Sequence, residues 1–258
     1  MSTILYPSPI FGPVNSRRLG LSLGINLLPP EGKICSFDCV YCECGLNAEN
    51  RPKFSMPTCD YVLERLEERI NELINLGRYP QAITFSGNGE PTGHPDFPKI
   101  VHGVIELRNR LLPKASVCCL TNATHLLKPE IFRALRSIDT PLLKLDTVSA
   151  EYIARVDRPT SFYDLPALLN LMKIFDGRCV IQTMFMTGFW KGQSVDNTTD
   201  EYVLPWVNTL KTIKPRLVTI YTLDREAPSQ TLLKASEKKL RRIAAYVTAA
   251  GIPVTVSI

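Results

Sequence analysis

Short apolar runs alternate with amphipathic segments along almost the whole of this chain of 258 residues. The apolar runs are continuous, which is typical of strands buried on both faces of a parallel sheet. The amphipathic segments carry apolar residues at helical spacing, and two of the helices are expected to begin with a capping box, Ser161 with Asp164 and Thr198 with Glu201. We expect strands at 22–28, 82–87, 115–121, 141–147, 178–186, 216–222 and 252–258, and helices at about 59–76, 97–111, 129–136, 161–175, 198–211 and 240–250.

The order of these segments is a sixfold strand–helix repeat closed by one more short strand. Six units in about 230 residues fit an incomplete barrel better than an open doubly wound sheet, and the first strand–helix turn lacks a G-x-G-x-x-G pattern. The expected fold class is therefore α/β, a partial (β/α)6 TIM-like barrel with parallel strands. No linker divides the chain, so we expect a single domain with a lead-in at 1–20, repeats at 21–250 and a terminal strand at 251–258.

Composition and charge exclude several classes of protein. Hydrophobic residues make up 45% of the chain and charged residues 21%, which excludes a disordered or fibrous protein. No apolar run reaches the roughly 18 residues of a membrane-spanning helix, and the first residues lack the pattern of a secretory signal, so we expect a cytoplasmic protein without a membrane partner. The net charge of +5 is compatible with an RNA partner but does not imply one, and the basic run at 237–242 is interpreted as a solvated helix face.

The eight cysteines are unevenly distributed, because four of them fall within ten residues. These four are Cys35, Cys39, Cys42 and Cys44. In a reducing compartment such a group indicates a metal site rather than a disulfide framework. Cys118, Cys119 and Cys179 lie in apolar strands and are interpreted as small buried hydrophobic residues. The roles of Cys44 and Cys59 stay open.

The spacing of the first three cysteines, C-x3-C-x2-C, narrows the kind of metal site. Thiolates from Cys35, Cys39 and Cys42 can bind three irons of a cubic cluster and leave the fourth iron without a protein ligand. A catalytic centre needs such an open position, whereas a structural site is normally closed. The alternative is a closed zinc or ferredoxin-like site with Cys44 as fourth ligand, in a protein that binds metal or transfers electrons without catalysis.

Polar and glycine-rich segments follow six of the expected strands. They are the cysteine loop, GNGEPTGHP, TNAT, DTVSAEY, TGFWKGQ and LDREAPS. Because β/α barrels place their active sites at the carboxyl ends of the strands, this pattern favours an enzyme with a single mouth. TGFWKGQ is interpreted as a mobile loop in which Trp190 either covers the substrate or packs, and His94 and His102 as capping or surface histidines.

The three cysteines, with Tyr41 directly before the last of them, resemble the radical S-adenosylmethionine (radical SAM) superfamily. The resemblance covers nearly the whole chain and implies a partial barrel with the cluster loop after the first strand. It also implies two cofactors, a 4Fe-4S cluster and S-adenosyl-L-methionine chelated to its open iron. In that family the reduced cluster cleaves the C5′–S bond, and the 5′-deoxyadenosyl radical abstracts hydrogen from the substrate. A small electron donor of flavodoxin or ferredoxin type is implied as a partner.

Other positions match the family's cofactor contacts one at a time. Gly87, Asn88, Gly89 and Glu90 occupy the place of its glycine–glycine–glutamate segment, although a simple polar turn is the alternative. There, glycines let the backbone approach the ligand and a carboxylate can pair with the methionine ammonium. Tyr41 resembles the residue whose backbone meets the adenine. Contacts to the ribose and carboxylate are implied for residues that end strands three, four and five, namely Thr121, Asn122, Lys144, Asp146 and Gln182, and a contact near the adenine or substrate for 222–225.

Three segments resemble one branch of the superfamily, the Fe–S oxidoreductases related to the wyosine-type enzyme that modifies tRNA(Phe). They are FGPVNSRRLGLSLGIN, SGNGEPTGHPDF, and KLDT followed by VDRPTSF. That relative uses a second cluster whose cysteines lie upstream of the first, whereas no cysteine precedes Cys35 here. The tRNA reaction is therefore only an alternative, and the substrate is left unassigned. Arg17 and Arg18 either hold a phosphate or carboxylate near the barrel or form ordinary ion pairs in a turn.

Overall fold

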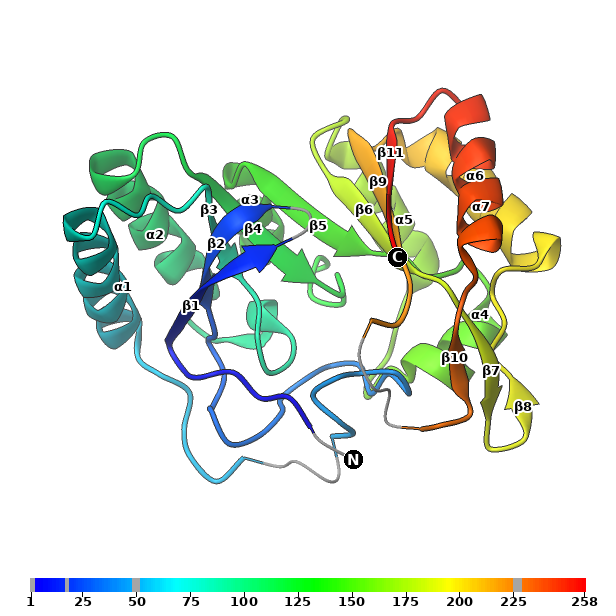
Figure 1. Cartoon of the computed structure of the whole chain (residues 1–258), viewed down its shortest axis with the longest axis horizontal. Coiled ribbons are helices and arrows are strands. Elements are labelled where there is room, and N and C mark those ends of the chain that lie inside the picture. Colours follow the sequence, from blue (N-terminus) through cyan, green and yellow to red (C-terminus); the bar gives the residue numbers. More distant parts are fainter. Residues whose placement is uncertain (1–2, 17–18, 48–51, 225–228) are drawn as a thin grey trace.

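One curled sheet of eight strands organises the molecule (Figure 1). The structure, a computed structural model, describes residues 3–16, 19–47, 52–224 and 229–258. In spatial order the strands are β1 (Ile10–Ser16), β2 (Gly20–Ile25), β3 (Ala82–Phe85), β4 (Ser116–Thr121), β5 (Thr140–Lys144), β6 (Val180–Met184), β9 (Leu217–Tyr221) and β11 (Val254–Ser257). All neighbours from β2 to β11 are parallel, which confirms the expected half-barrel of β/α units. The assignment of the whole chain to one domain stays a prediction.

The edge strand β1 was not expected, because Gly12 and Pro13 interrupt the apolar residues of its sequence IFGPVNS. It pairs antiparallel with β2, and the register shifts between Phe11 and Val14. The ring of Phe11 lies over Gly24, where a Cβ atom would come within 2.2 Å of the ring. A glycine in β2 therefore lets the lead-in segment close against the sheet.

Helices pack against the outer face of the sheet, three around its first half and three around its second (Figure 1). They are α1 (Cys59–Asn75), α2 (Phe97–Leu111), α3 (Pro129–Ser137), α5 (Leu165–Ile174), α6 (Asp200–Ile213) and α7 (Glu237–Ala249). The short helical turns are η1 (Pro91–Gly93), α4 (Ala150–Tyr152) and the π-helix η2 (Ile153–Asp157). The main core lies between helices and sheet. Adjacent residues of β4 point to opposite sides, so Cys119 lies in this core and Cys118 in a smaller one with Leu142 and Val180, and both thiols are buried as expected.

Two expected helix starts differ from the structure by one to three residues. Asp164 itself is the N-cap of α5, because its side chain accepts a hydrogen bond from the backbone N–H of Ala167, and Ser161 is exposed before it. Helix α6 has Thr199 as its N-cap, while Thr198 donates its hydroxyl proton to Asp196. In both cases the sequence offers adjacent side chains with capping ability, and tertiary contacts decide between them.

A small second sheet lies where the sequence suggested a mobile loop. Its strands are β7 (Met186–Trp190), β8 (Gln193–Ser194) and β10 (Leu232–Lys234), all antiparallel. The segment TGFWKGQ is thus a hairpin, and the expected strand at 178–186 is divided between two sheets. Gly188 permits this arrangement, since it has φ +99° and a Cβ atom there would lie 2.1 Å from the carbonyl oxygen of Thr231. In the described part of the chain, no helix is both long and apolar enough to span a membrane.

Candidate functional site

The cysteine loop, residues 33–45, follows β2 in the sequence. It lies below the sheet in Figure 1, at the carboxyl ends of the parallel strands. Segment 156–160, which we call the strap, holds it from the far half of the chain. The backbone N–H of Asp38 donates to the carbonyl of Asp157 at 3.0 Å, and that of Val40 donates to Val156 at 3.0 Å. In the opposite direction Thr160 N–H donates to the Ser36 carbonyl at 2.9 Å. The loop is therefore fixed on one side by a backbone ladder.

Local backbone conformation aims the strap at the loop. It begins at the end of the π-helix η2, and Arg158 follows in the left-handed region with φ +52°. Both features are uncommon and gather at functional sites. The Arg158 guanidinium pairs with Asp38 of the loop at 2.9 Å. The strap thus contributes an ion pair as well as backbone bonds.

Burial is the main cause of a raised thiol pKa in two of the three expected iron ligands. It raises the pKa of the Cys35 thiol to about 12, with the Glu90 charge acting in the same direction. Burial also holds the pKa of Cys39 well above its usual range, and the Cys39 thiol lies 3.9 Å from Asp157 Oδ1. In contrast, a hydrogen bond from Cys44 lowers the pKa of Cys42, and Lys33 acts in the same direction.

This donor set fits a cubic cluster better than a single ion. Among the described residues, no three His, Cys, Asp or Glu side chains converge on one metal position. Convergence is not required of a cluster in which each cysteine binds a different iron. Buried thiols with a raised pKa are protonated until a metal replaces the proton, which is the usual behaviour of such ligands. The sulfur of Cys44 lies 3.6 Å from the carbonyl oxygen of Gly87, so this fourth cysteine also contacts the glycine segment.

The glycine segment after β3 packs directly against the cysteine loop. Ile34 N–H donates to the Asn88 carbonyl and Glu90 N–H donates to the Ile34 carbonyl, both at 3.0 Å. Gly89, with φ +137°, is required because a Cβ atom there would lie 1.8 Å from the Ile34 oxygen. The side chain of Asn88 is engaged elsewhere, since its amide donates to the carbonyls of Tyr6 and Pro29. Its visible role is to hold the N-terminal segment.

Glu90 is a buried carboxylate that is surrounded by neutral donors. Its Oε1 accepts the hydroxyls of Thr92 at 2.5 Å and Thr121 at 2.6 Å, and its Oε2 accepts the backbone N–H of Asn122 at 2.7 Å. Only 3% of Glu90 is exposed, and in the described part of the chain it forms no ion pair. The oxygens are satisfied. A basic side chain, His125, lies next to Glu90 through the Thr92 hydroxyl at 3.1 Å, but burial lowers the pKa of His125, so the negative charge of Glu90 is not paired with a full positive charge. The ammonium group of a bound amino acid would supply the missing positive charge.

A second buried charge group lies at the end of β5. The ammonium of Lys144 contacts Asp146 and the hydroxyl of Tyr41, and lies 3.0 Å from Asp157 Oδ1. Tyr41 also donates its hydroxyl proton to Asp146. Burial opposes the charge of Lys144, but Asp146 and Asp157 outweigh it and hold its pKa well above the usual range. Burial raises the pKa of Asp157 to about 7.

The structure brings most of the expected residues together and leaves others outside. Thr121, Asn122, Lys144 and Asp146 lie at or just after the ends of their strands. Gln182 occupies the middle of β6, where the register of the two strands places it beside Lys144 at the end of β5. Thr222 is buried and accepts a hydrogen bond from Ala235 N–H, while Arg225, Arg17 and Arg18 lie outside the described residues.

The histidines and the tryptophan have ordinary structural partners. His94 accepts from Asp96 N–H and is hydrogen-bonded to the Pro57 carbonyl, and His102 pairs with Glu106 on the surface of α2, as expected. Trp190 packs against the core that contains Tyr41 and carries the Lys191 ammonium over its ring.

Sequence reasoning missed Lys33, Asp157 and Arg158. Lys33 had a signal, since it precedes the first cysteine by two residues. Asp157 and Arg158 lie in the VDRPTSF segment, whose sequence carries a family resemblance but no indication of their roles. Nothing local in that segment indicates contact with a loop that lies more than a hundred residues earlier in the chain.

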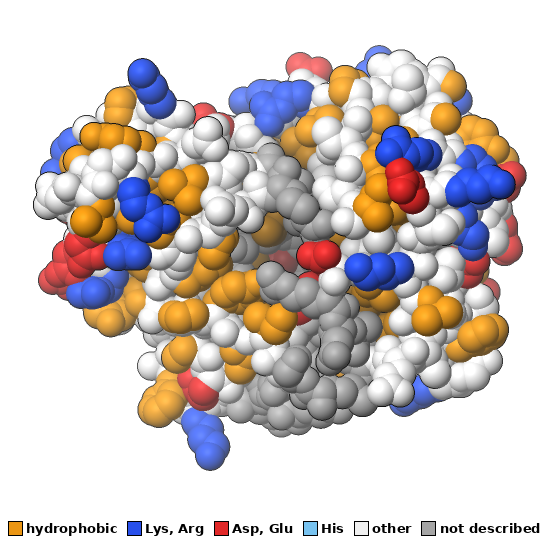
Figure 2. Space-filling model, viewed as in Figure 1, with side chains coloured by type: hydrophobic (Ala, Val, Ile, Leu, Met, Phe, Trp, Pro, Cys, Tyr) orange, Lys and Arg blue, Asp and Glu red, His pale blue; other side chains and the backbone are white. Residues whose placement is uncertain are grey.

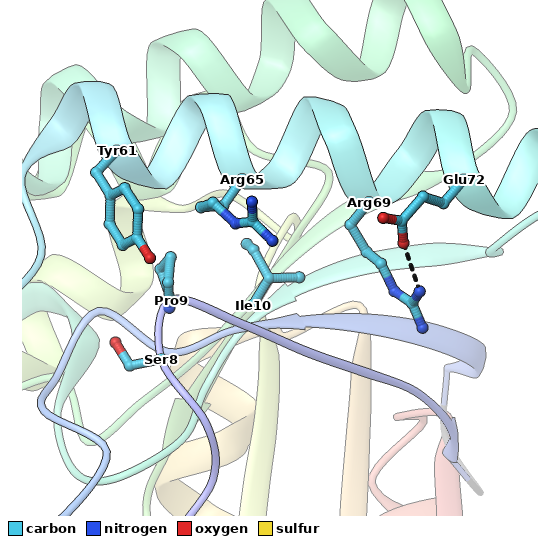
Figure 3. A pocket seen from close by; sticks show the side chains of 7 residues that line it. All are labelled: Ser8, Pro9, Ile10, Tyr61, Arg65, Arg69 and Glu72. Carbon is cyan, nitrogen blue, oxygen red and sulfur yellow. Dashed lines mark hydrogen bonds and ion pairs between the residues drawn. The ribbon is translucent and has the colours of Figure 1, made fainter.

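A cavity of about 210 Å³ lies away from this site, between the N-terminal segment and α1 (Figure 3). It is lined by Ser8, Pro9, Ile10, Tyr61, Arg65, Arg69 and Glu72. Arg69 is engaged by Glu72 at 2.7 Å and by the Gly12 carbonyl, and Arg65 pairs with Glu68. The cavity contains none of the expected cofactor residues.

Comparisons with known proteins identify relatives by sequence and by fold. The chain is 32% identical over 233 residues to the UPF0026 protein slr1464 of Synechocystis sp., covering 87% of this chain and 79% of that protein. It is 27% identical over 244 residues to a protein of Brachyspira hyodysenteriae named GTPase Obg, covering 93% of this chain. The chain spans only 33% of the length of that second relative.

Several solved structures share the fold at low sequence identity. A radical SAM methyltransferase from Sphaerobacter thermophilus superposes with a TM-score of 0.69 at 16% identity, over 92% of this chain and 65% of that one. Streptococcus suis SuiB bound to S-adenosylmethionine gives 0.64 at 18%, over 91% and 50%. TYW1 with a lysine-pyruvate adduct gives 0.59 at 13%, over 88% and 73%. Residues 32–190, from the cysteine loop to β7, match the family described as the Radical SAM superfamily. The chain belongs to the radical SAM superfamily.

Proposed function

We propose that this chain is a radical SAM enzyme that holds a 4Fe-4S cluster on Cys35, Cys39 and Cys42 and binds S-adenosyl-L-methionine beside Glu90. When bound, these two groups supply one-electron, hydrogen-abstracting chemistry. The observation that carries the proposal is the buried and uncompensated charge of Glu90 beside the cysteine loop. A buried charge is costly unless it is paired, so a cationic ligand group has a large electrostatic reason to occupy this position.

Asn122 supports the proposal because it connects the two cofactor positions. Its backbone N–H donates to Glu90, and its side-chain amide donates to the Sγ of Cys35 at 3.6 Å and to the hydroxyl of Ser36 at 3.0 Å. One residue thus fixes the carboxylate relative to the first cysteine. A ligand that pairs with Glu90 is thereby oriented toward the cysteine loop.

The residues around Tyr41 exclude water from the other side of the loop. Tyr41 and Cys39 are both buried, and Tyr41 is held by Lys144 and Asp146. Because hydrogen-abstracting chemistry must be protected from side reactions, a dry and rigid wall here serves it. The backbone of Tyr41 is proposed to contact the adenine, and its side chain to keep that backbone in place.

The substrate stays unassigned, and the wyosine-type reaction remains the alternative. A lysine must lose its proton before it can add to a carbonyl group. Lys144 is held between two carboxylates that keep its pKa high, so its visible role is to pair charges rather than to attack pyruvate. On the face shown in Figure 2, the described Lys and Arg side chains are spread over both halves and interspersed with acidic ones, so among the described residues there is no continuous basic track for RNA. A small electron donor of flavodoxin or ferredoxin type is the proposed partner.

The test is anaerobic reconstitution with iron and sulfide, followed by reduction with dithionite and addition of S-adenosyl-L-methionine. We expect about four irons per chain and formation of 5′-deoxyadenosine and methionine, measured by mass spectrometry. Cys42→Ala should lose iron and product. Cys59→Ala removes a thiol that lies at the start of α1 and should keep both.

Two outcomes would contradict the proposal. Zinc in place of iron would indicate a closed structural site. A cluster that forms but never cleaves the cosubstrate would indicate an electron-transfer module.

A further inference from the structure

Lys33 is a buried cation at the base of the cysteine loop. Its side chain is 1% exposed, and its ammonium donates to the carbonyl of Gly45 at 2.8 Å. Residues 33 and 45 are the two ends of the loop, so this hydrogen bond closes it. Its positive charge also lowers the pKa of the Cys42 thiol and acts on Cys35 and Cys39.

The positive charge of Lys33 is only weakly compensated by the chain. Its nearest carboxylate oxygen is Asp38 Oδ1 at 3.8 Å. Asp38 is already engaged, because it pairs with Arg158 at 2.9 Å and accepts the Asn47 backbone N–H at 2.7 Å. Lys144 is different, since two carboxylates hold its ammonium. Lys144 also acts on Cys39, but Lys33 has the weaker carboxylate compensation of these two lysines and acts on Cys35 and Cys42.

Electrostatics predict what such a charge does. Three thiolates around an iron–sulfur core make a negative group, and reduction adds one more electron without forming or breaking a bond. In a poorly solvated site, a nearby cation stabilises the more negative state. Reduction potentials of these clusters respond to net charge, hydrogen bonds to sulfur and exposure, and Lys33 acts on the first of these.

We infer that Lys33 is the counter-charge of the cysteine loop and raises the one-electron reduction potential of a cluster held by Cys35, Cys39 and Cys42. The inference rests on the proposed function, because it requires that the loop hold this cluster. It adds to that function a residue that is not an iron ligand. It also explains why a lysine is buried where a neutral residue would avoid the cost of desolvation.

The test compares Lys33→Gln and Lys33→Arg with the wild-type protein after reconstitution. Glutamine keeps an N–H donor for the Gly45 carbonyl but removes the charge, whereas arginine keeps the charge. The midpoint potential is measured by a redox titration followed by EPR, together with iron content. For Lys33→Gln we expect a more negative potential, with the ratio of reduced to oxidised cluster at fixed potential falling about tenfold, or about 59 mV for one electron. Lys33→Arg and the distant surface variant Lys173→Gln should stay within about twofold of wild type.

Asp38→Asn tests the inference from the opposite direction. It removes the carboxylate nearest to Lys33 while an amide oxygen can still accept the Asn47 N–H. The potential should therefore rise, and an unchanged potential would overturn the inference even if Lys33→Gln fails to retain iron.

The possible failures are distinguishable. If the wild-type protein assembles no iron–sulfur cluster, the proposed function fails. If all variants bind equal iron and neither charge change moves the potential, the cluster assignment stands and the role of Lys33 is overturned, because closing the loop is then its whole contribution.

Discussion

Two buried acidic sites flank the cysteine loop, and they handle their charge in opposite ways. Glu90 accepts hydrogen bonds from two hydroxyls and two backbone N–H groups and is paired with no cation in the described part of the chain. Asp146 and Asp157 share the ammonium of Lys144. The Glu90 carboxylate thus has all its hydrogen bonds but no cationic partner among the described residues, whereas the two aspartates already have one. This difference supports the proposal that the Glu90 side receives a cationic group, whereas the Lys144 side holds Tyr41 and the strap.

The largest expected effect breaks the balanced site. Lys144→Met leaves two buried carboxylates without their cation, which typically costs about 3–5 kcal/mol of unfolding free energy. Urea denaturation of the metal-free protein measures it. Lys239→Met is the matched control, because it removes a half-exposed ion pair with Asp196 and should cost about 1 kcal/mol or less. If both variants lose the same unfolding free energy, the Lys144 ammonium stabilises the fold no more than an ordinary surface ion pair does.

The second largest effect is a pH dependence of stability that arises from Asp157 in the Lys144 site. The pKa of Asp157 is raised to about 7, so its contribution is fully present below the unfolded pKa of about 4 and is lost as pH rises through 7. A folded pKa about three pH units above the unfolded one corresponds to a change on the order of 4 kcal/mol in the free energy of unfolding. Asp157→Asn should remove this decline, measured as unfolding free energy of the metal-free protein between about pH 4 and 8. If the unfolding free energy of Asp157→Asn falls with pH as steeply as that of the wild type, a group other than Asp157 is responsible for the decline.

A substitution at Glu90 is expected to change the binding of S-adenosyl-L-methionine rather than the stability of the fold. Glu90→Gln keeps an oxygen to accept the Thr121 and Thr92 hydroxyls but removes the charge. Because hydrogen bonds to charged groups contribute about 1.5–3 kcal/mol, affinity for S-adenosyl-L-methionine should fall roughly 10- to 100-fold, measured by calorimetry on the reconstituted protein. Glu106→Gln, which changes an exposed carboxylate on α2, should bind like wild type. Wild-type affinity in Glu90→Gln would remove the basis for placing the cosubstrate there.

The smallest effect concerns the neutral donors of Glu90. Thr121→Val deletes one hydroxyl and leaves the other donors in place, so it should cost about 1–2 kcal/mol of unfolding free energy. Thr209→Val on the exposed face of α6 should stay within about 0.5 kcal/mol of wild type. If Thr121→Val leaves the unfolding free energy unchanged, the remaining hydrogen-bond donors are sufficient to stabilise the Glu90 carboxylate.

Periodicity predicted the sheet and its helices well because both depend on burial. The expected helix at 97–111 has the same bounds as α2, and every expected strand of the parallel sheet is present. Periodicity failed where backbone geometry decides. The edge strand β1 is built around Gly12 and Pro13, and the hairpin after β6 depends on Gly188 and on pairing with β10. In these places a contact distant in sequence selects a structure that the local pattern does not favour.

The candidate site was predictable to the extent that its chemistry is local. The cysteines, the glycine segment and Glu90 lie in two short motifs, so their residue types and spacing were informative. The partners of those residues were not. Asp157 reaches Cys39 only through the strap, and Lys144 acquires its high pKa from carboxylates that the fold brings together. Electrostatic environment is a property of the assembled structure, and only its strongest local contributors are visible in the sequence.

The strap has a consequence for how the protein is made. Cys39 precedes Asp157 by 118 residues, and at about 5–20 residues per second the ribosome needs roughly ten seconds to synthesise that stretch. During this interval the cysteines are outside the ribosome without the backbone ladder that fixes their loop. The loop takes its final shape only once the chain has been made beyond residue 160. If the loop holds the proposed cluster, we expect cluster delivery to follow synthesis, when the two halves of the chain have already come together.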